Sequence, residues 1–153
     1  PCGKKRDLPS SDSLFRQGIS AEIIPGTDPS ILDYLQEKGC RGVYVEGFGL
    51  GGMPFLKNDF IGAVKKAVEN GMVILAGSQC RYEGSNLSVY ETGRRALESG
   101  VLQAYDMTAE AAMAKLMWVL GQTDSLREIR EYFSVDIAGE VTILKSEAGN
   151  HSF

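Results

Sequence analysis

Met72-Val73-Ile74-Leu75-Ala76 is a continuous run of five apolar residues with a glycine on either side. Apolar runs of this length, without a polar side chain, are typical of strands buried on both faces of a parallel sheet. Helix-length amphipathic segments precede and follow this run, at residues 58–70 and 88–100. Such an alternation of strands and helices predicts a parallel sheet covered by helices.

The same alternation extends in both directions along the chain. The expected strands are residues 19–24, 43–46, 72–76 and 101–104. The expected helices begin near Asp28, Asn58, Ser88, Thr108 and Ser125, each of which can cap a helix N-terminus. The predicted fold class is therefore α/β: a three-layer α/β/α domain with a small, mostly parallel four-stranded sheet, Rossmann-like or flavodoxin-like.

This domain is expected to span residues 18–143. Residues 1–17 carry charge, a proline and a serine cluster without apolar periodicity, so they predict an interdomain linker. Residues 144–153 predict a disordered tail, and we expect the chain to fray already beyond Val135. The chain lacks an initiator Met and a signal-peptide h-region, so we expect a truncated or excised chain.

For the last two helices, the sequence also predicts which residues are buried. The helix at residues 109–120 is apolar almost all round, with only Glu110 and Lys115 charged, so we expect it to be largely buried, with Trp118 in the core. The last helix follows Ser125, and we expect its buried face to consist of Leu126, Ile129 and Phe133.

Composition excludes several classes of protein. The 153 residues are 43% hydrophobic and 24% charged, with 20 acidic and 16 basic side chains, which is average for a globular domain and gives no basic surface for nucleic acid. The apolar runs are much too short to span a membrane. Three widely spaced cysteines argue against a disulfide framework, so we expect a reducing, cytoplasmic location.

The expected binding site lies at the carboxyl edge of the sheet, where loops and helix N-termini converge in open parallel folds. Two loops reach that edge, residues 46–54 and 77–83. Their polar side chains and glycines are candidates for contacts with a ligand, an effector or a neighbouring protomer. The candidates are Glu46, Gly49, Gly52, Ser78, Gln79, Cys80 and Glu83.

Dinucleotide binding is an alternative for the first loop, because Gly47, Gly49 and Gly52 satisfy the G-x-G-x-x-G spacing. The residues around these glycines differ from the dinucleotide-binding pattern. Met53-Pro54 separates the glycines from the next helix, and the acidic residue at the expected distance, Glu69, lies within a helix. A flexible turn is favoured, and no cofactor is expected.

Hydrolytic and metal chemistry within this chain also lack support. A catalytic Cys80 or Ser78 needs a histidine base, and the only histidine is His151 near the C-terminus. The cysteines have no paired spacing and no histidine cluster, so no metal site is predicted. Buried packing is as good an interpretation of Cys80 as ligand contact.

Five segments, taken in order, resemble the C-terminal domain of the cytoplasmic type I L-asparaginases. They are Ile24-Pro25-Gly26, the loop at residues 46–54, Ser78-Gln79-Cys80, residues 90–100 and residues 106–122. The resemblance implies an amidohydrolase that converts L-asparagine to L-aspartate and ammonia, and assembles as a homodimer or homotetramer. Its nucleophilic threonines lie in the N-terminal domain. No Thr-Gly-Gly-Thr segment occurs in this sequence, so no catalytic residue is expected here.

The resemblance also bears on the candidate site. Ser78 and Cys80 match residues of an asparagine effector site found in some members. Glu46 stands where the regulated bacterial enzyme has an arginine, which argues against asparagine regulation. Gly52 aligns with an asparagine that reaches the neighbouring active site, so that contact is in question here. Glu83 offers a substitute carboxylate.

Two other functions fit the same residues. One is the asparaginase-like subunit of glutamyl-tRNA amidotransferase, which shares much of the pattern. The other is a free-standing domain that binds a small molecule or mediates assembly. The gene sequence upstream of Pro1 distinguishes all three.

Overall fold

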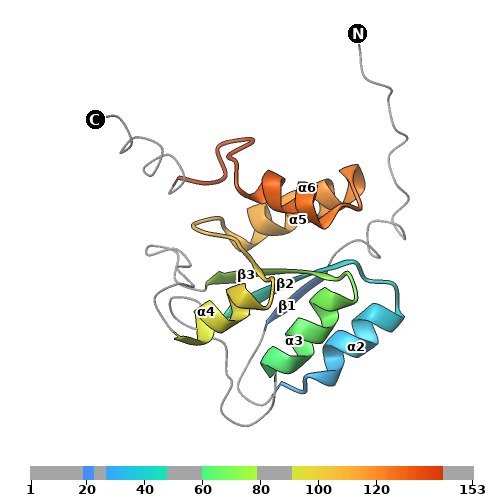
Figure 1. Cartoon of the computed structure of the whole chain (residues 1–153). Coiled ribbons are helices and arrows are strands. Elements are labelled where there is room, and N and C mark those ends of the chain that lie inside the picture. Colours follow the sequence, from blue (N-terminus) through green and yellow to red (C-terminus); the bar gives the residue numbers. More distant parts are fainter. Residues whose placement is uncertain (1–18, 23–26, 48–59, 79–90, 143–153) are drawn as a thin grey trace.

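A computed structural model of the chain describes residues 19–22, 27–47, 60–78 and 91–142, and it confirms the alternation of strands and helices (Figure 1). In chain order the elements are β1 (Ile19–Glu22), α2 (Ser30–Glu37), β2 (Gly42–Gly47), α3 (Phe60–Glu69), β3 (Val73–Ser78), α4 (Glu91–Glu98), β4 (Leu102–Gln103), α5 (Ala109–Gln122) and α6 (Leu126–Phe133).

The four strands form one sheet in the order β1-β2-β3-β4, and every neighbouring pair is parallel. Helices α2, α3 and α4 cover one face of the sheet, and α5 and α6 cover the other (Figure 1). Side chains alternate between the two faces along each strand. Val43 and Val45 therefore pack with α2 and α3, whereas Tyr44 packs with α5 and α6. The predicted three-layer α/β/α architecture is confirmed.

Predicted helix starts agree with the structure at Thr108 and Ser125, and to within one residue at α2, whose N-cap is Pro29. Thr108 Oγ1 accepts a hydrogen bond from Ala111 N at 3.2 Å, and Ser125 Oγ accepts one from Glu128 N at 3.4 Å. Asp28 Oδ1 accepts one from Ser30 N at 2.9 Å, just ahead of α2. The starts predicted at Asn58 and Ser88 lie outside the described residues.

Helices α2, α3 and α4 are each followed by a glycine with a left-handed backbone. The φ angles are 79° at Gly39, 89° at Gly71 and 92° at Gly100. Glycine adopts this conformation without the steric penalty that a Cβ atom brings, so it ends a helix and turns the chain toward the next strand.

Some expectations about the helical layers are wrong. Trp118 is 47% exposed rather than buried, and it contacts Tyr132 edge to face, with ring centroids 5.4 Å apart. Leu126 is 39% exposed, so the buried stripe of α6 consists of Ile129 and Phe133. For α3, the apolar spacing predicts an inner face of Ile61, Val64 and Val68. The structure buries Val64 together with Phe60 and Ala67, whereas Ile61 and Val68 are only partly buried.

The expected fraying beyond Val135 is also wrong, because a buried ion pair fixes the following segment. Lys115 Nζ lies 2.6 Å from Glu140 Oε1 and 2.6 Å from the Val135 carbonyl oxygen. The Glu140 carboxylate also accepts hydrogen bonds from Ile137 N and Ala138 N. Val141 is fully buried just after this pair. The ordered domain therefore extends at least to Thr142, whose backbone N–H donates to Asp106 at 3.0 Å.

Candidate functional site

Two of the predicted site residues lie at or near the C-terminal ends of the neighbouring central strands β2 and β3. Glu46 is near the end of β2, and Ser78 is the last residue of β3. In the parallel register Glu46 pairs with Gly77, and Gly47 pairs with Ser78. The structure therefore brings Glu46 and Ser78 to the same edge of the sheet. The other candidates, Gly49, Gly52, Gln79, Cys80 and Glu83, lie outside the described residues.

Tyr44 is buried beneath this edge of the sheet. It lies two residues before Glu46, so both side chains project to the α5 face of β2. Tyr44 is 1% exposed, and its ring extends along the sheet to Gly77. A Cβ atom on Gly77 would overlap the Tyr44 hydroxyl oxygen and lie 2.8 Å from ring carbons Cε2 and Cζ. Glycine is required at residue 77 because the tyrosine occupies the space above it.

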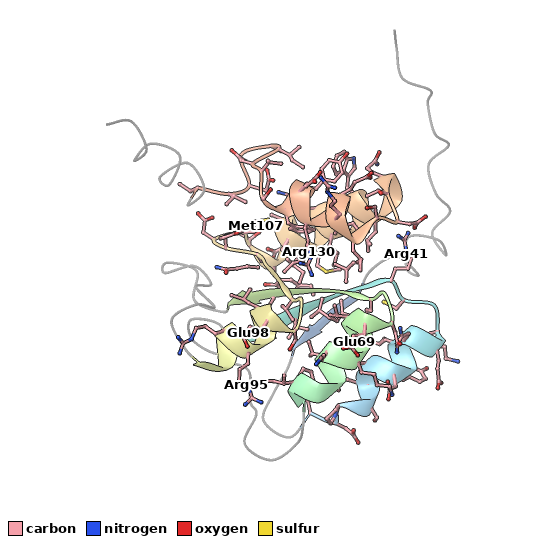
Figure 2. All side chains as sticks on the ribbon, in the orientation of Figure 1. Arg41, Glu69, Arg95, Glu98, Met107 and Arg130 are labelled. Carbon is pink, nitrogen blue, oxygen red and sulfur yellow. The ribbon has the colours of Figure 1, made fainter. Side chains whose placement is uncertain are left out.

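Helix α5 points its N-terminus toward the carboxyl edge. Arg41, just before β2, donates from Nη1 to the Leu120 carbonyl oxygen at 2.9 Å and from Nη2 to the Thr123 carbonyl oxygen at 3.3 Å. Arg41 reaches from the sheet to the α5–α6 layer (Figure 2). Since the C-terminal end of α5 lies at the start of β2, its N-terminal end lies at the other edge. The positive end of the helix dipole therefore faces the ends of the strands.

Two acidic side chains belong to the part of the sheet edge near the N-terminus of α5. Glu110 is in the first turn of α5, and Glu46 lies at the end of β2. Burial raises the pKa of the Tyr44 hydroxyl to about 12, and the nearby carboxylates of Glu46 and Glu110 act in the same direction. The Tyr44 hydroxyl therefore stays protonated and neutral throughout the physiological pH range.

The described groups at this edge do not form a hydrolytic centre by themselves. Acyl transfer needs a nucleophile with an adjacent base and donors for the oxyanion. Among the described residues, the edge has the Glu46 carboxylate and the N-terminus of α5, above the buried Tyr44 phenol. The same part of the chain holds no cluster of three or more His, Cys, Asp or Glu side chains that could bind a metal ion. Over residues 27–47, 60–78 and 91–142, no helix is long and apolar enough to cross a membrane.

Tyr44 and Glu110 are the described edge residues that sequence reasoning missed. The signal for Tyr44 was available: it is a polar aromatic within an apolar strand, at two-residue spacing from Glu46. The sequence identifies Glu110 only as a charged residue on an apolar helix. Its place at the edge depends on the direction of α5, which Arg41 fixes through contacts about 80 residues away along the chain.

The fold is a parallel α/β domain, and its described residues place Glu46 and Ser78 at the carboxyl edge of the sheet. The chain belongs to the glutaminase/asparaginase C-terminal domain family, whose sequence profile matches residues 20–133. The resemblance to L-asparaginases is thereby confirmed at the level of the family.

Individual relatives include two proteins of Thermococcus kodakarensis. The chain is 44% identical over 132 residues to a subunit of its glutamyl-tRNA(Gln) amidotransferase, covering 86% of this chain and 29% of the relative. It is 40% identical over 124 residues to its L-asparaginase, covering 81% of this chain and 37% of the relative. The chain therefore spans much less than half the length of either relative.

Solved structures agree with this assignment. The thermostable L-asparaginase from Thermococcus kodakarensis matches with a TM-score of 0.77 at 38% identity, over 82% of this chain and 38% of that one. L-asparaginase I from Vibrio cholerae matches with a TM-score of 0.72 at 28% identity, over 82% of this chain and 37% of that one. Both matches extend over most of this chain but only over part of the longer protein.

Proposed function

We propose that this chain is the C-terminal domain of the asparaginase-like subunit of a glutamyl-tRNA(Gln) amidotransferase. The supporting observation is the higher identity over a longer alignment with the amidotransferase relative than with the L-asparaginase of the same organism, 44% over 132 residues against 40% over 124. Because both relatives come from one organism, evolutionary distance between species does not explain the difference in sequence identity. The intact protein would release ammonia from an amide, for transfer to glutamyl-tRNA(Gln).

In this proposal the nucleophile belongs to an N-terminal domain, and the domain described here contributes the polar edge of its sheet. Glu46 and Ser78 are the described candidates for contact with a ligand or a neighbouring protomer. The proposed candidates outside the described residues are Gly49, Gly52, Gln79, Cys80 and Glu83. We further propose that residues 1–17 link the two domains and that the protein acts in the cytoplasm as a homo-oligomer.

The test has two steps. The gene upstream of Pro1 should encode a Thr-Gly-Gly-Thr segment within about 200 residues, an ordinary domain length. The intact protein, combined with the rest of the amidotransferase, should then convert labelled glutamyl-tRNA(Gln) to glutaminyl-tRNA(Gln). An upstream region without such a domain would sink the proposal.

L-asparaginase is the second candidate, supported by the structural match to the Thermococcus kodakarensis enzyme with a TM-score of 0.77. It predicts rapid ammonia release from free L-asparagine without any tRNA, and no amidation of glutamyl-tRNA(Gln). Measuring both reactions with the same preparation separates the two candidates.

Glu46→Gln should weaken substrate or effector binding by the intact protein about 10-fold, because a hydrogen bond to a charged group contributes about 1.5–3 kcal/mol and the amide retains only part of it. The maximal rate of ammonia release should change less than the half-saturating concentration. Glu98→Gln on the exposed side of α4 is the matched control. Equal kinetics for Glu46→Gln and Glu98→Gln would remove Glu46 from the site.

A further inference from the structure

The turn between β4 and α5 has a strained backbone. Tyr105 has a φ of 54°, and among the described residues it is the one residue other than glycine with a positive φ. Met107 N donates to the Ala104 carbonyl oxygen at 3.1 Å, so Tyr105 is the first of the two central residues of a β-turn. Glycine is favoured at that position when φ is positive, because a Cβ atom there clashes with the backbone. Tyr105 therefore has a steric penalty that glycine would avoid.

This turn lies at the carboxyl edge of the sheet. Ala104 N donates to the Ala76 carbonyl oxygen of β3 at 2.8 Å, just after β4 ends. Thr108, the cap of α5, follows the turn, and Glu110 is in the first turn of that helix. Met107, labelled in Figure 2, marks the turn between the sheet and the α5–α6 layer. The conformation of the turn therefore sets where α5 begins relative to the strand ends.

Residues 135–142, which we call the C-terminal strap, contact this turn directly. Thr142 N donates to both carboxylate oxygens of Asp106, at 3.0 and 3.1 Å. Asp106 is the second central residue of the turn, next to Tyr105. Val141, beside this contact, is fully buried in the core cluster between the sheet and α5. A strained backbone persists only where surrounding contacts hold it, and the strap supplies such a contact.

The strap has a second anchor near the middle of α5. The Glu140 carboxylate accepts hydrogen bonds from Lys115 Nζ at 2.6 Å and from Ala138 N at 2.6 Å. A single residue separates Glu140 from Thr142, so the two anchors cannot move independently. Loss of the anchor at Lys115 therefore weakens the anchor at Asp106.

We propose that the C-terminal strap and the strained turn form a conformational switch that couples the C-terminal segment to the carboxyl edge. With the strap bound, Asp106 is held and Tyr105 keeps its positive φ. With the strap released, Tyr105 relaxes to a negative φ, and the start of α5 with Glu110 moves relative to the strand ends. The coupling is reciprocal, because a change that favours one state of the turn favours the matching state of the strap. It is independent of the proposed function, since both anchors lie within this chain.

Amide hydrogen exchange of the 153-residue chain, followed by NMR, tests the coupling from the strap to the turn. The reporters are the amides of Met107, in the turn, and Ala111, which donates to the cap of α5. Glu140→Gln should raise their exchange rates about 10-fold, the factor expected from weakening one hydrogen bond to a charged group. The anchor that this variant weakens is at Lys115, outside the turn.

Asp106→Ala tests the coupling in the opposite direction. It should raise the exchange rates of Ile137 and Ala138, whose amides donate to Glu140. The matched control is Asp33→Asn, which alters a carboxylate that accepts from Lys66 at 2.9 Å on the opposite layer. The control should change the exchange rates of neither the turn nor the strap.

Tyr105→Gly tests the strain, because glycine adopts a φ of 54° without the penalty. In this background the effect of Glu140→Gln on the Met107 amide should fall from about 10-fold to about 2-fold, since the penalty of a left-handed residue corresponds to a factor of at least about 5. A turn without strain has little to gain from release of the strap.

Three results would overturn the inference. The first is faster exchange only around the substituted residue, in Glu140→Gln or in Asp106→Ala, which would mean that strap and turn move separately. The second is an equal rise in the amides of β2 and β3, which would mean unfolding of the whole domain. The third is the same effect of Glu140→Gln with and without Tyr105→Gly, which would mean that strain has no part. Failure of the intact protein to release ammonia would remove the proposed function and leave this inference standing.

Discussion

Lys115→Met should lower the free energy of unfolding by about 3–5 kcal/mol, the usual cost of removing one partner of a buried ion pair. The Lys115 side chain is 5% exposed and the Glu140 side chain 11% exposed, and the two are 2.6 Å apart. Methionine fills similar space but leaves the carboxylate buried without its cation. The measurement is urea unfolding at pH 7. Lys65→Met is the control, because its partner Glu69 is 3.9 Å away and both side chains are well exposed, so its loss should stay below about 0.5 kcal/mol.

The same pair predicts a pH dependence. Burial alone would raise the pKa of Glu140, but hydrogen bonds from Lys115 and from the backbone of Ala138 and Ile137 outweigh it and hold the pKa well below its ordinary value of 4.5. A carboxylate with a depressed folded-state pKa contributes stability that is fully present above the unfolded pKa. This stability is lost as the pH falls from about 4.5 toward the lower folded-state value.

Unfolding measured at pH 7, 4 and 3 should therefore show a loss of stability in acid. Glu140→Gln should reduce this dependence of stability on pH, because the amide does not titrate.

The double variant Lys115→Met with Glu140→Gln should be more stable than Lys115→Met alone, since no buried charge remains unpaired. A loss of less than about 1 kcal/mol in Lys115→Met, or an unchanged acid slope in Glu140→Gln, would contradict the description of this pair.

Gly77→Ala should destabilise the domain by about 3 kcal/mol or more, the upper range for overpacking a rigid core. The added methyl group would overlap the Tyr44 hydroxyl and lie 2.8 Å from two ring carbons. Tyr44→Phe should not rescue the variant, because the ring carbons stay in place, whereas Tyr44→Leu should restore part of the loss. Thermal and urea unfolding of the three variants are the measurement.

Gly39→Ala is the comparison for Gly77→Ala, because nothing lies within 4 Å of its added Cβ and only its φ of 79° is unfavourable. It should lose about 1–2 kcal/mol from that backbone strain. Tolerance of alanine at Gly77, or a larger loss at Gly39, would mean that Tyr44 does not fill the space above Gly77.

The fold followed from the sequence because its signals are local. The run at Met72–Ala76, the caps Thr108 and Ser125 and the terminal Gly100 each act within a few residues of their own position. The errors arose where the deciding contact is distant. Glu140 orders the segment after Val135 through Lys115, 25 residues earlier, and this pairing cannot be read from local periodicity. Trp118 lies on an apolar helix, but which of its sides meets the sheet depends on the packing of α5.

Of the candidate site, the sequence predicted where two described residues lie in the fold, but not which other side chains lie near them. Strand ends of a parallel sheet gave Glu46 and Ser78, whereas Tyr44 and Glu110 required the register and the direction of α5. The family was predictable from ordered motifs, but its members share them. For that reason the sequence interpretation placed L-asparaginase first, whereas the comparisons give better support to the amidotransferase alternative, at 44% identity against 40%.

Release of ammonia from L-asparagine and L-glutamine, measured in parallel for the purified 153-residue chain and for the intact protein, tests the central claim most directly. In the proposed function, this domain supports amide hydrolysis without carrying the nucleophile. The intact protein should release ammonia from at least one of the two amides. The chain alone, purified from a host without its own asparaginase, should release none. Turnover by the chain alone would contradict the account.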